Sequence, residues 1–213
     1  LASEILRKVS RQTEYEGQSP TQVLIGLHAV PFAWLQEPII YVSGKPLQEK
    51  FHVEGKHAAL LDFFSPDFEY LLYEDAEKAR LKRPAERSQY DKDVLKTDER
   101  FNILNGVFNG YYLKIFPKPG DSTNSWYSPY DTYGWAHDDS VLVSGMMKLY
   151  VGGVQEGIAT DDWSSADKVV DLISAYQRKT TPEEVLPSES KINLEIWYNN
   201  ANLFKRLMYG YLA

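Results

Sequence analysis

The longest stretch of helical periodicity in the chain lies between residues 85 and 116. Apolar side chains recur there at helical spacing, and charged side chains fill the positions between them. The apolar set is Tyr90, Val94, Phe101, Leu104, Phe108, Tyr111 and Leu113. This pattern predicts a long helix with one buried face that ends at the proline-rich residues 117–120. Gly106 and Gly110 lower helix propensity but permit another element to pack closely.

Proline positions predict further helices before this segment. Ser19 and Pro20 predict a helix start. The Ser19 hydroxyl can cap the first turn, and Pro20 loses nothing there because the first N–H groups of a helix have no partner within the helix. That helix should end before Pro31. Ser65 and Pro66 predict a second start. Its inner face would carry Phe68, Leu71, Leu72 and Ala76.

The second half of the chain is also predicted to be helical. A helix is expected over residues 140–150, where Gly152 and Gly153 form a termination signal. Another is expected over residues 163–176, capped by Asp161 or Asp162. Its inward side chains would be Val169, Val170, Leu172 and Ile173.

Strand signals are confined to one region. Residues 39–42, Ile-Ile-Tyr-Val, are the best strand candidate. Residues 47–51 are ambiguous, and residues 58–64 are read as a strand or as the approach to a helix. We therefore predict a mainly α, helix-rich single domain over residues 1–213, with one small β-sheet or hairpin near residues 38–63. A sub-boundary is placed near residues 117–137, in a loop-like stretch.

A C-terminal helix is predicted over residues 188–213. Ser188 or Ser190 can cap it. Its apolar stripe is Ile192, Ile196, Leu203, Leu207 and Tyr211, widened by Trp197, Phe204 and Met208. The stripe predicts a face buried against the same domain, or a helix that leads toward a membrane segment beyond Ala213. Because the chain starts at Leu1 without Met, we expect a fragment or a processed product.

Composition excludes several classes of function. The 23 basic and 30 acidic residues give a net charge of −7, which disfavours general nucleic-acid binding because phosphates are repelled. The chain has no cysteine, which excludes thiol catalysis, disulfides and thiolate metal sites. Its longest apolar run falls short of the roughly 18 residues that a membrane span needs.

Histidines and carboxylates are weighed as metal or catalytic groups. His52 and His57 lie near Glu49 and Glu54, but a spacing of five does not place both rings on one helix face, so surface histidines are the favoured interpretation. His28 is read as a partly buried ring. Adjacent acidic pairs do not face each other, and phosphate-loop and serine-nucleophile motifs are absent from the sequence. No metal ligand and no catalytic residue is predicted.

Aromatic residues form the strongest chemical cluster. Trp126, Tyr127, Tyr130, Tyr133 and Trp135 lie within ten positions of one another, followed by His137 and Asp138. Exposed rings of this kind stack on sugars, on haem or on peptide side chains. The alternative is that the rings anchor the loop onto the core. These seven residues are the candidate binding site.

Residues 83–119, RPAERSQYDKDVLKTDERFNILNGVFNGYYLKIFPKP, followed by NSWYSP at 124–129, resemble a known family. They are similar to the large extracytoplasmic segment of the fused ResB/CcsA-type cytochrome c biogenesis proteins of Bacteroidetes. The stretches 19–34, 60–66 and 187–212 fit the same segment, and the last resembles the approach to the next transmembrane helix.

The resemblance implies a role in System II cytochrome c maturation, in which the membrane machine carries haem outward and attaches it to apocytochromes. The tryptophan-rich haem-handling motif and haem-ligand histidines of that family belong to its CcsA portion, and neither is found in this sequence. Therefore His28, His52, His57 and His137 inherit no haem-ligand role. No cofactor is expected in this domain, and haem would be handled by the parent protein.

The leading hypothesis is a non-catalytic domain at the periplasmic face of the inner membrane. It would scaffold the complex or dock apocytochrome c and other System II components, and flanking segments would tether it to the membrane. An acidic surface suits lysine-rich cytochromes. The docking surface would combine the aromatic loop with acids near Asp138 and Asp161. The alternative is a glycan-binding or glycan-cleaving protein, which predicts Trp126 or Trp135 in a concave site beside paired carboxylates.

Overall fold

A computed structural model describes residues 1–53, 55–201 and 207 of the chain. The predicted helix-rich class is confirmed. The described residues form the helices α1 (Ala2–Ser10), α2 (Pro20–Ala29), α3 (Pro31–Leu35), α4 (Lys45–Lys50), α5 (Tyr73–Leu81), α6 (Gln89–Phe108), α7 (His137–Thr160), α8 (Ser164–Thr180) and α9 (Glu189–Ala201). Short 3₁₀ turns are η1 (Leu61–Phe63) and η2 (Pro84–Glu86).

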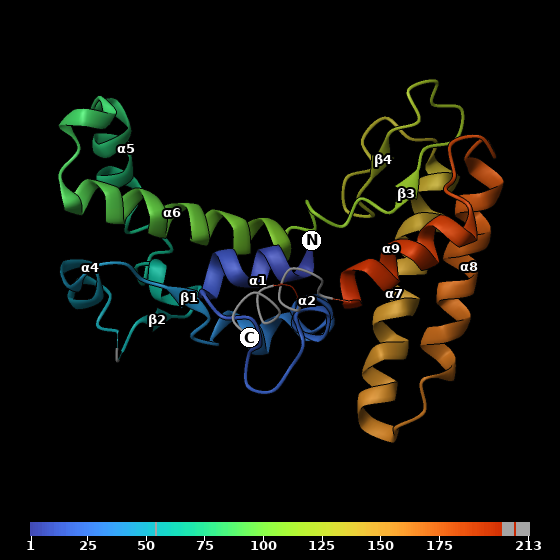
Figure 1. Ribbon diagram of the computed structural model, residues 1–213, viewed down its shortest axis with the longest axis horizontal. Coiled ribbons are helices and arrows are strands. Elements are labelled where there is room, and N and C mark those ends of the chain that lie inside the picture. The colour runs from blue at the N-terminus through green and yellow to red at the C-terminus, as the bar shows by residue number, and fades with distance from the viewer. Residues whose placement is uncertain (54, 202–206, 208–213) are drawn as a thin grey trace.

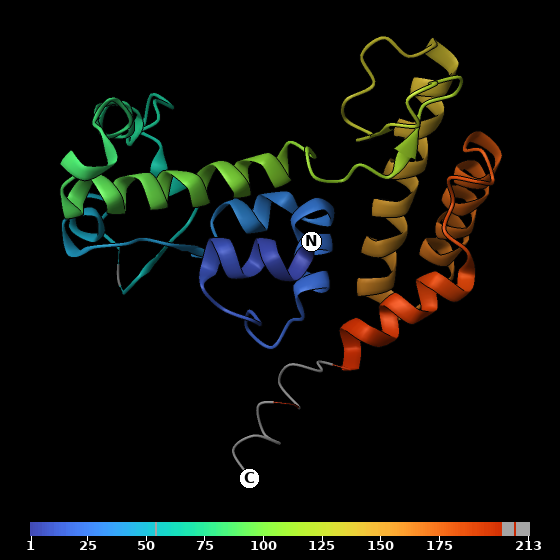
Figure 2. The ribbon, with the colours of Figure 1, turned by 45° about the horizontal axis from the view of Figure 1, so that its top comes forward.

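The elements form an elongated molecule with two helical parts (Figures 1 and 2). In the first part, α6 lies lengthwise over α1 and β1 (Ile40–Tyr41), and α4 and α5 lie at its far end. In the second part, α7 and α8 form an antiparallel hairpin. The larger hydrophobic core draws its buried residues from positions 5–107, and a smaller core joins Phe116 to Val143, Met146 and Tyr176.

The two parts meet through small side chains. Ala29 of α2, Val154 of α7 and Ala166 of α8 form a third buried cluster. The Gln155 side chain donates a hydrogen bond to the Ala29 carbonyl, which is one of the last in α2. This contact fixes the hairpin against α2.

Helix α6 begins and ends at residues with known capping and termination signals. Ser88 caps α6 and forms a reciprocal capping box with Asp91. The helix ends at Phe108 and not at residue 116 as predicted, because Gly110 adopts a left-handed conformation with a φ of 72°. The chain then folds back, so that the Tyr112 ring packs where a side chain at position 106 would lie. Tyr111 is consequently exposed rather than buried.

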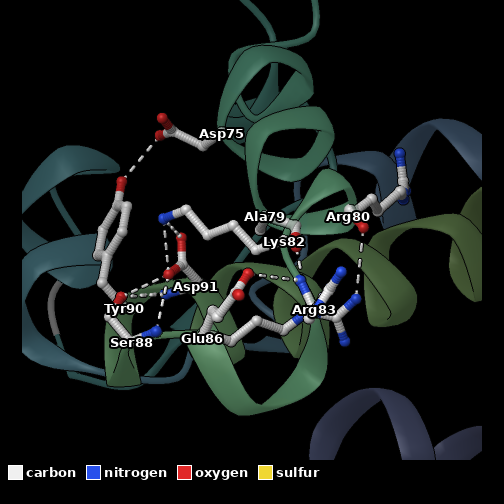
Figure 3. A network of polar contacts seen from close by, with 10 residues as sticks. Asp75, Ala79, Arg80, Lys82, Arg83, Glu86, Ser88, Tyr90 and Asp91 are labelled. Atoms are coloured by element: carbon white, nitrogen blue, oxygen red, sulfur yellow. Dashed lines mark hydrogen bonds and ion pairs between the residues drawn. The ribbon is translucent and has the colours of Figure 1, made fainter.

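Charged residues of α6 hold the neighbouring elements. Lys82 donates to both carboxylate oxygens of Asp91, at 2.7 and 2.8 Å (Figure 3). Asp98 pairs with Arg80 of α5 and accepts a hydrogen bond from the Tyr70 hydroxyl at 3.0 Å. These bonds tie α5 and the loop before it to α6.

Arg100 links α6 to β1 and to the residues that follow β1. It is 4% exposed. Its Nη1 donates to the Tyr41 carbonyl at 2.9 Å and to the Ser43 hydroxyl at 2.7 Å, and its guanidinium lies 5.0 Å from the centre of the Tyr41 ring. Burial lowers the pKa of Arg100. Neutral acceptors and a ring face therefore fix β1 to α6.

Two antiparallel sheets of two strands are present in the described residues. The predicted sheet near residues 38–63 is confirmed, with Ile40 opposite Ala58 and Tyr41 opposite His57 in β1 and β2 (His57–Ala58). The second sheet pairs β3 (Phe116–Pro117) with β4 (Trp126–Tyr127) and was not predicted, because proline is unfavourable in strands. Residues 45–50, which overlap the ambiguous segment, form α4.

The predicted helix start at Ser65 is wrong. The Ser65 hydroxyl accepts hydrogen bonds from the N–H groups of Asp67 and Glu69, at 3.2 and 3.1 Å, and so stabilises a local turn. Phe68 has a φ of 61° and is 78% exposed. The helix α5 begins at Tyr73, eight positions after Ser65, and Ala76 is buried as expected.

The predicted end of α7 at Gly152 and Gly153 is also wrong, since the helix continues to Thr160. A Cβ at position 153 would lie 2.7 Å from the backbone nitrogen of Ala166, and one at position 157 would lie 2.5 Å from the Trp163 ring. These glycines therefore permit close packing of α7 on α8 rather than helix termination. Asp162 accepts the Ser164 N–H at 3.0 Å at the start of α8. Val169 is buried, whereas Val170 and Leu172 are exposed against expectation.

The predicted C-terminal helix is present from Glu189 to Ala201 as α9, which meets α8 where Arg178 pairs with Glu189 at 3.1 Å. Ile192, Ile196 and Trp197 are exposed, so the expected buried stripe is wrong for them. Apolar residues at 192, 194, 196, 197 and 198 point to several sides of α9, so one face cannot bury them all. Leu203, Phe204, Met208 and Tyr211 lie outside the described residues. Within the described part, no helix has the length and apolarity that crossing a bilayer requires.

Adjacent glycines of α7 provide a matched test of the hairpin contact. Gly153→Ala places a methyl group against the Ala166 backbone and should lower the free energy of unfolding by about 1–3 kcal/mol. Gly152 has open space at its Cβ position, so Gly152→Ala should raise it by up to about 1 kcal/mol through helix propensity. Urea unfolding followed by circular dichroism measures both variants. Equal effects would contradict close packing at Gly153.

The Asp91 cluster predicts a defined acid sensitivity. Hydrogen bonds from Lys82 and Ser88 lower the pKa of Asp91 from 3.8 to about 2. Because the folded pKa lies below the unfolded one, the ionised group stabilises the fold above about pH 4, and this stabilisation is lost as the pH falls toward 2. Asp91→Asn should therefore unfold more easily at pH 7 and lose less stability between pH 4 and pH 2.

Urea unfolding at a series of pH values measures this difference. Asp67→Asn is the control, because Asp67 is exposed and its carboxylate accepts no hydrogen bond from the described residues. An Asp91→Asn variant with the same acid profile as the wild type would rule out the proposed role of the carboxylate.

Candidate functional site

The β3–β4 turn positions the first half of the aromatic segment. The Asp121 carboxylate accepts hydrogen bonds from the N–H and hydroxyl of Thr123 at 2.9 and 2.8 Å, from the Ser125 N–H at 3.2 Å and from the Tyr127 hydroxyl at 3.3 Å. These bonds, beginning with those from Thr123, lower the pKa of Asp121 and keep its carboxylate charged. Asp121 therefore fixes the turn that presents Trp126.

Trp126 lines a groove between β4, α8 and the start of α9. The groove has a volume of about 760 Å³. We call it the Trp126 groove, and its lining includes Gln177, Arg178, Glu183, Leu186, Glu189 and Ile192. Arg178 pairs with Glu189 across it, whereas the Gln177 side chain donates to the Ile115 carbonyl at 2.9 Å. The groove combines one indole ring with apolar and charged rims.

Tyr127 and Trp135 pack on each other instead of forming an open platform. Their rings meet edge to face, with centroids 5.6 Å apart. Trp135 also packs on the smaller core, and its buried Nε1 has no acceptor among the described residues. Both rings therefore anchor the loop, as the alternative interpretation of the cluster proposed.

Tyr130 faces α2 on the other side of the loop. Its ring is stacked on His28, with centroids 6.3 Å apart and an interplanar angle of 12°. A Cβ at position 110 would lie 2.0 Å from the Tyr130 ring, so this close approach requires glycine. Burial lowers the pKa of His28, and the imidazole is neutral at pH 7.

The remaining candidate residues are exposed. Tyr133 is 97% exposed at the tip of the loop, which Lys118 holds by donating to the Gly134 carbonyl at 2.9 Å. His137 and Asp138 form the first turn of α7. Asp161 lies at the opposite end of this helix, about 35 Å away at 1.5 Å per residue, so it does not share a surface with Asp138.

The seven candidate residues thus do not form one site. The structure places Trp126 in the groove, buries much of Tyr127 and Trp135 in packing, directs Tyr130 to α2 and leaves Tyr133, His137 and Asp138 exposed. The groove also brings Glu183 and Glu189 beside Trp126. Glu189 forms an ion pair with Arg178 at 3.1 Å, which links α8 to α9 at this groove.

The histidines weighed as metal ligands are separated. The His57 Nε2 lies 2.9 Å from the Ser10 carbonyl, and its ring meets Tyr41 edge to face. In the part of the chain that the structure describes, no three His, Asp or Glu residues are grouped as a metal site. Glu54 lies outside the described residues.

Several residues that shape the site were not identified from the sequence. The signal for Asp121 is present, since an Asp after Pro-Gly followed by Thr and Ser is typical of a side-chain-stabilised turn. His28 and Tyr130 are 102 positions apart, and no local pattern joins them. The same holds for Trp126 and Arg178, which line one groove because α8 packs beside β3 and β3 pairs with β4.

Comparison with known proteins finds sequence similarity to part of a longer protein. The whole chain is similar to a segment of Protein NrfI from Wolinella succinogenes. The two sequences are 32% identical over 224 residues, which include 100% of this chain. The chain spans 23% of the length of Protein NrfI, so it corresponds to less than a quarter of that protein. No family model matches the chain.

Trp135 tests the loop-anchor interpretation. Trp135→Ala removes a ring from the smaller core and should lower the free energy of unfolding by about 3–5 kcal/mol. Trp135→Phe keeps an aromatic ring and removes an N–H without an acceptor, whose burial costs about 1–3 kcal/mol, so it should cost less than half as much. Urea unfolding distinguishes the two. Equal losses would show that the indole N–H is needed.

Proposed function

We propose that this chain is an extracytoplasmic domain of a cytochrome c biogenesis protein of the ResB/CcsA type. The observation that carries the proposal is the similarity of the whole chain to Protein NrfI, which supports a role in cytochrome c biogenesis and haem attachment. The resemblance of residues 83–119 and 124–129 to the System II proteins supports the finer assignment. The domain is proposed to lie at the periplasmic face of the inner membrane, tethered by flanking segments.

Within such a protein the domain would dock or scaffold, and the haem would be handled by the parent protein. Three of its least exposed carboxylates are used in structural pairs: Asp91 with Lys82, Asp98 with Arg80, and Asp75 with Lys50. Asp121 is engaged in the turn beside Trp126. These assignments support a binding role for the domain rather than a catalytic one.

The Trp126 groove is the proposed docking surface for apocytochrome c. An indole ring in a concave site is a common anchor for a partner side chain. Glu183 and Glu184 are exposed beside it, in a chain with a net charge of −7. Opposite charge accelerates the encounter with a lysine-rich polypeptide. An unfolded apocytochrome segment would therefore approach through charge and be held through Trp126.

Binding of a haem-free c-type cytochrome to the purified domain tests this proposal. Calorimetry at rising salt should show weaker binding, because charges separated by more than a Debye length of about 10 Å at 0.1 M salt are screened. Trp126→Ala should weaken binding about tenfold or more, which is the effect expected of a central aromatic anchor. Glu183→Lys should weaken binding and flatten its salt dependence.

Matched controls come from the other helical part. Phe32→Ala removes an aromatic ring that is 84% exposed on α3. Glu14→Lys changes the net charge as Glu183→Lys does, at another exposed position. Both should bind the apocytochrome as the wild type does. Absent binding, or binding that salt does not affect, would overturn the proposed docking role.

A further inference from the structure

An apolar cavity lies where α2 meets the α7–α8 hairpin. Its volume is about 290 Å³. It is lined from α2 by Leu24 and Ile25, from α7 by Met147 and Val151, and from α8 by Val170 and Ile173. Apart from His28 and Tyr150, every lining residue is apolar. The volume is close to the lower end of the range of about 300–1,000 Å³ that is typical of ligand sites. We call it the inner cavity.

A second hollow adjoins it. This outer hollow has a volume of about 490 Å³ and shares His28, Met147 and Val151 with the inner cavity. Its lining is different in character, because it includes polar groups of Thr132, Ser144 and Lys148. Lys148 is exposed, and it is the only formally charged residue among the described residues that line the outer hollow. The pair of hollows thus combines an apolar part with a part that carries a cation.

His28 stands at the junction. Its ring is held by the stack on Tyr130, which in turn is seated against Gly110. The imidazole forms no hydrogen bond with the part of the chain that the structure describes. As a neutral ring it offers one donor and one acceptor nitrogen. A polar group at the junction can therefore be satisfied without a charge entering the inner cavity.

We propose that the two hollows bind one amphipathic monocarboxylate with an unbranched aliphatic body. The body would fill the inner cavity, where branched side chains and the adaptable thioether of Met147 remove it from water. The carboxylate would lie in the outer hollow near Lys148 and the hydroxyls of Thr132 and Ser144. The reverse orientation would bury an unpaired charge among apolar groups, which is strongly unfavourable. This site is separate from the Trp126 groove proposed for apocytochrome docking.

Charge reversal at Lys148 is the sharpest test. Dodecanoate, used below its micelle concentration, should bind the intact chain saturably with one site in calorimetry. Lys148→Glu should raise its Kd about tenfold or more, because a favourable charge becomes a repulsive one. Dodecyltrimethylammonium, which has the same length and the opposite charge, should bind the wild type more weakly and gain affinity in Lys148→Glu. Lys148 is exposed, so the variant is expected to fold.

Filling the inner cavity provides the second arm. Val170→Trp projects a larger ring from a position that is 49% exposed and should abolish dodecanoate binding. Val141→Trp is the matched control on α7, at a position that is 57% exposed and does not line either hollow, and it should bind as the wild type does. Absent saturable binding, or binding unchanged in both Lys148→Glu and Val170→Trp, would overturn the proposal.

Discussion

The first helical part depends on charged side chains that α6 directs inward. Asp91, Asp98 and Arg100 are each about 95% buried, and a buried charge is tolerated only when it is paired or fully hydrogen-bonded. Asp91 and Asp98 therefore require Lys82 and Arg80, and Arg100 requires the Tyr41 carbonyl and Ser43. Since these partners come from both sides of α6, the charges fix where α5 and β1 lie. Another position for α5 or β1 would leave one of these buried charges without its partner, which is strongly unfavourable.

The second helical part depends on glycines of α7, which have no side chain at the contact with α8. Gly153 and Gly157 let α7 approach α8 and the residue before it so closely that a Cβ would collide with the Ala166 backbone or the Trp163 ring. The same crossing brings Val154 and Ala166 against Ala29, so the contact that closes the hairpin also attaches it to α2. Ala29 and Val154 of this junction also line the inner cavity. The contact that attaches the hairpin to α2 therefore also forms part of the wall of the inner cavity.

Local sequence information was sufficient to predict the helix class, the β1–β2 sheet and the capped start of α2, because periodicity, strand propensity and capping residues are all local signals. It failed where the same residue type is suited to two different local structures. Gly152 and Gly153 carry a termination signal, yet their role is set by α8, which lies outside any local window. Ser65 and Pro66 suit a helix start, yet the serine hydroxyl closes a turn instead. Tyr130 has a sequence signal as one of a run of aromatic residues, whereas its contact with His28 depends on tertiary structure alone.

The division of the aromatic segment decides how its function should be understood. Because Trp126 and Tyr130 face different elements, a single ligand stacked on all five rings is incompatible with the fold. Tyr127 and Trp135 lie between them and hold the loop rigid against the smaller core. The loop can thus serve two neighbouring sites without moving, a groove suited to a polypeptide and a cavity suited to an aliphatic chain.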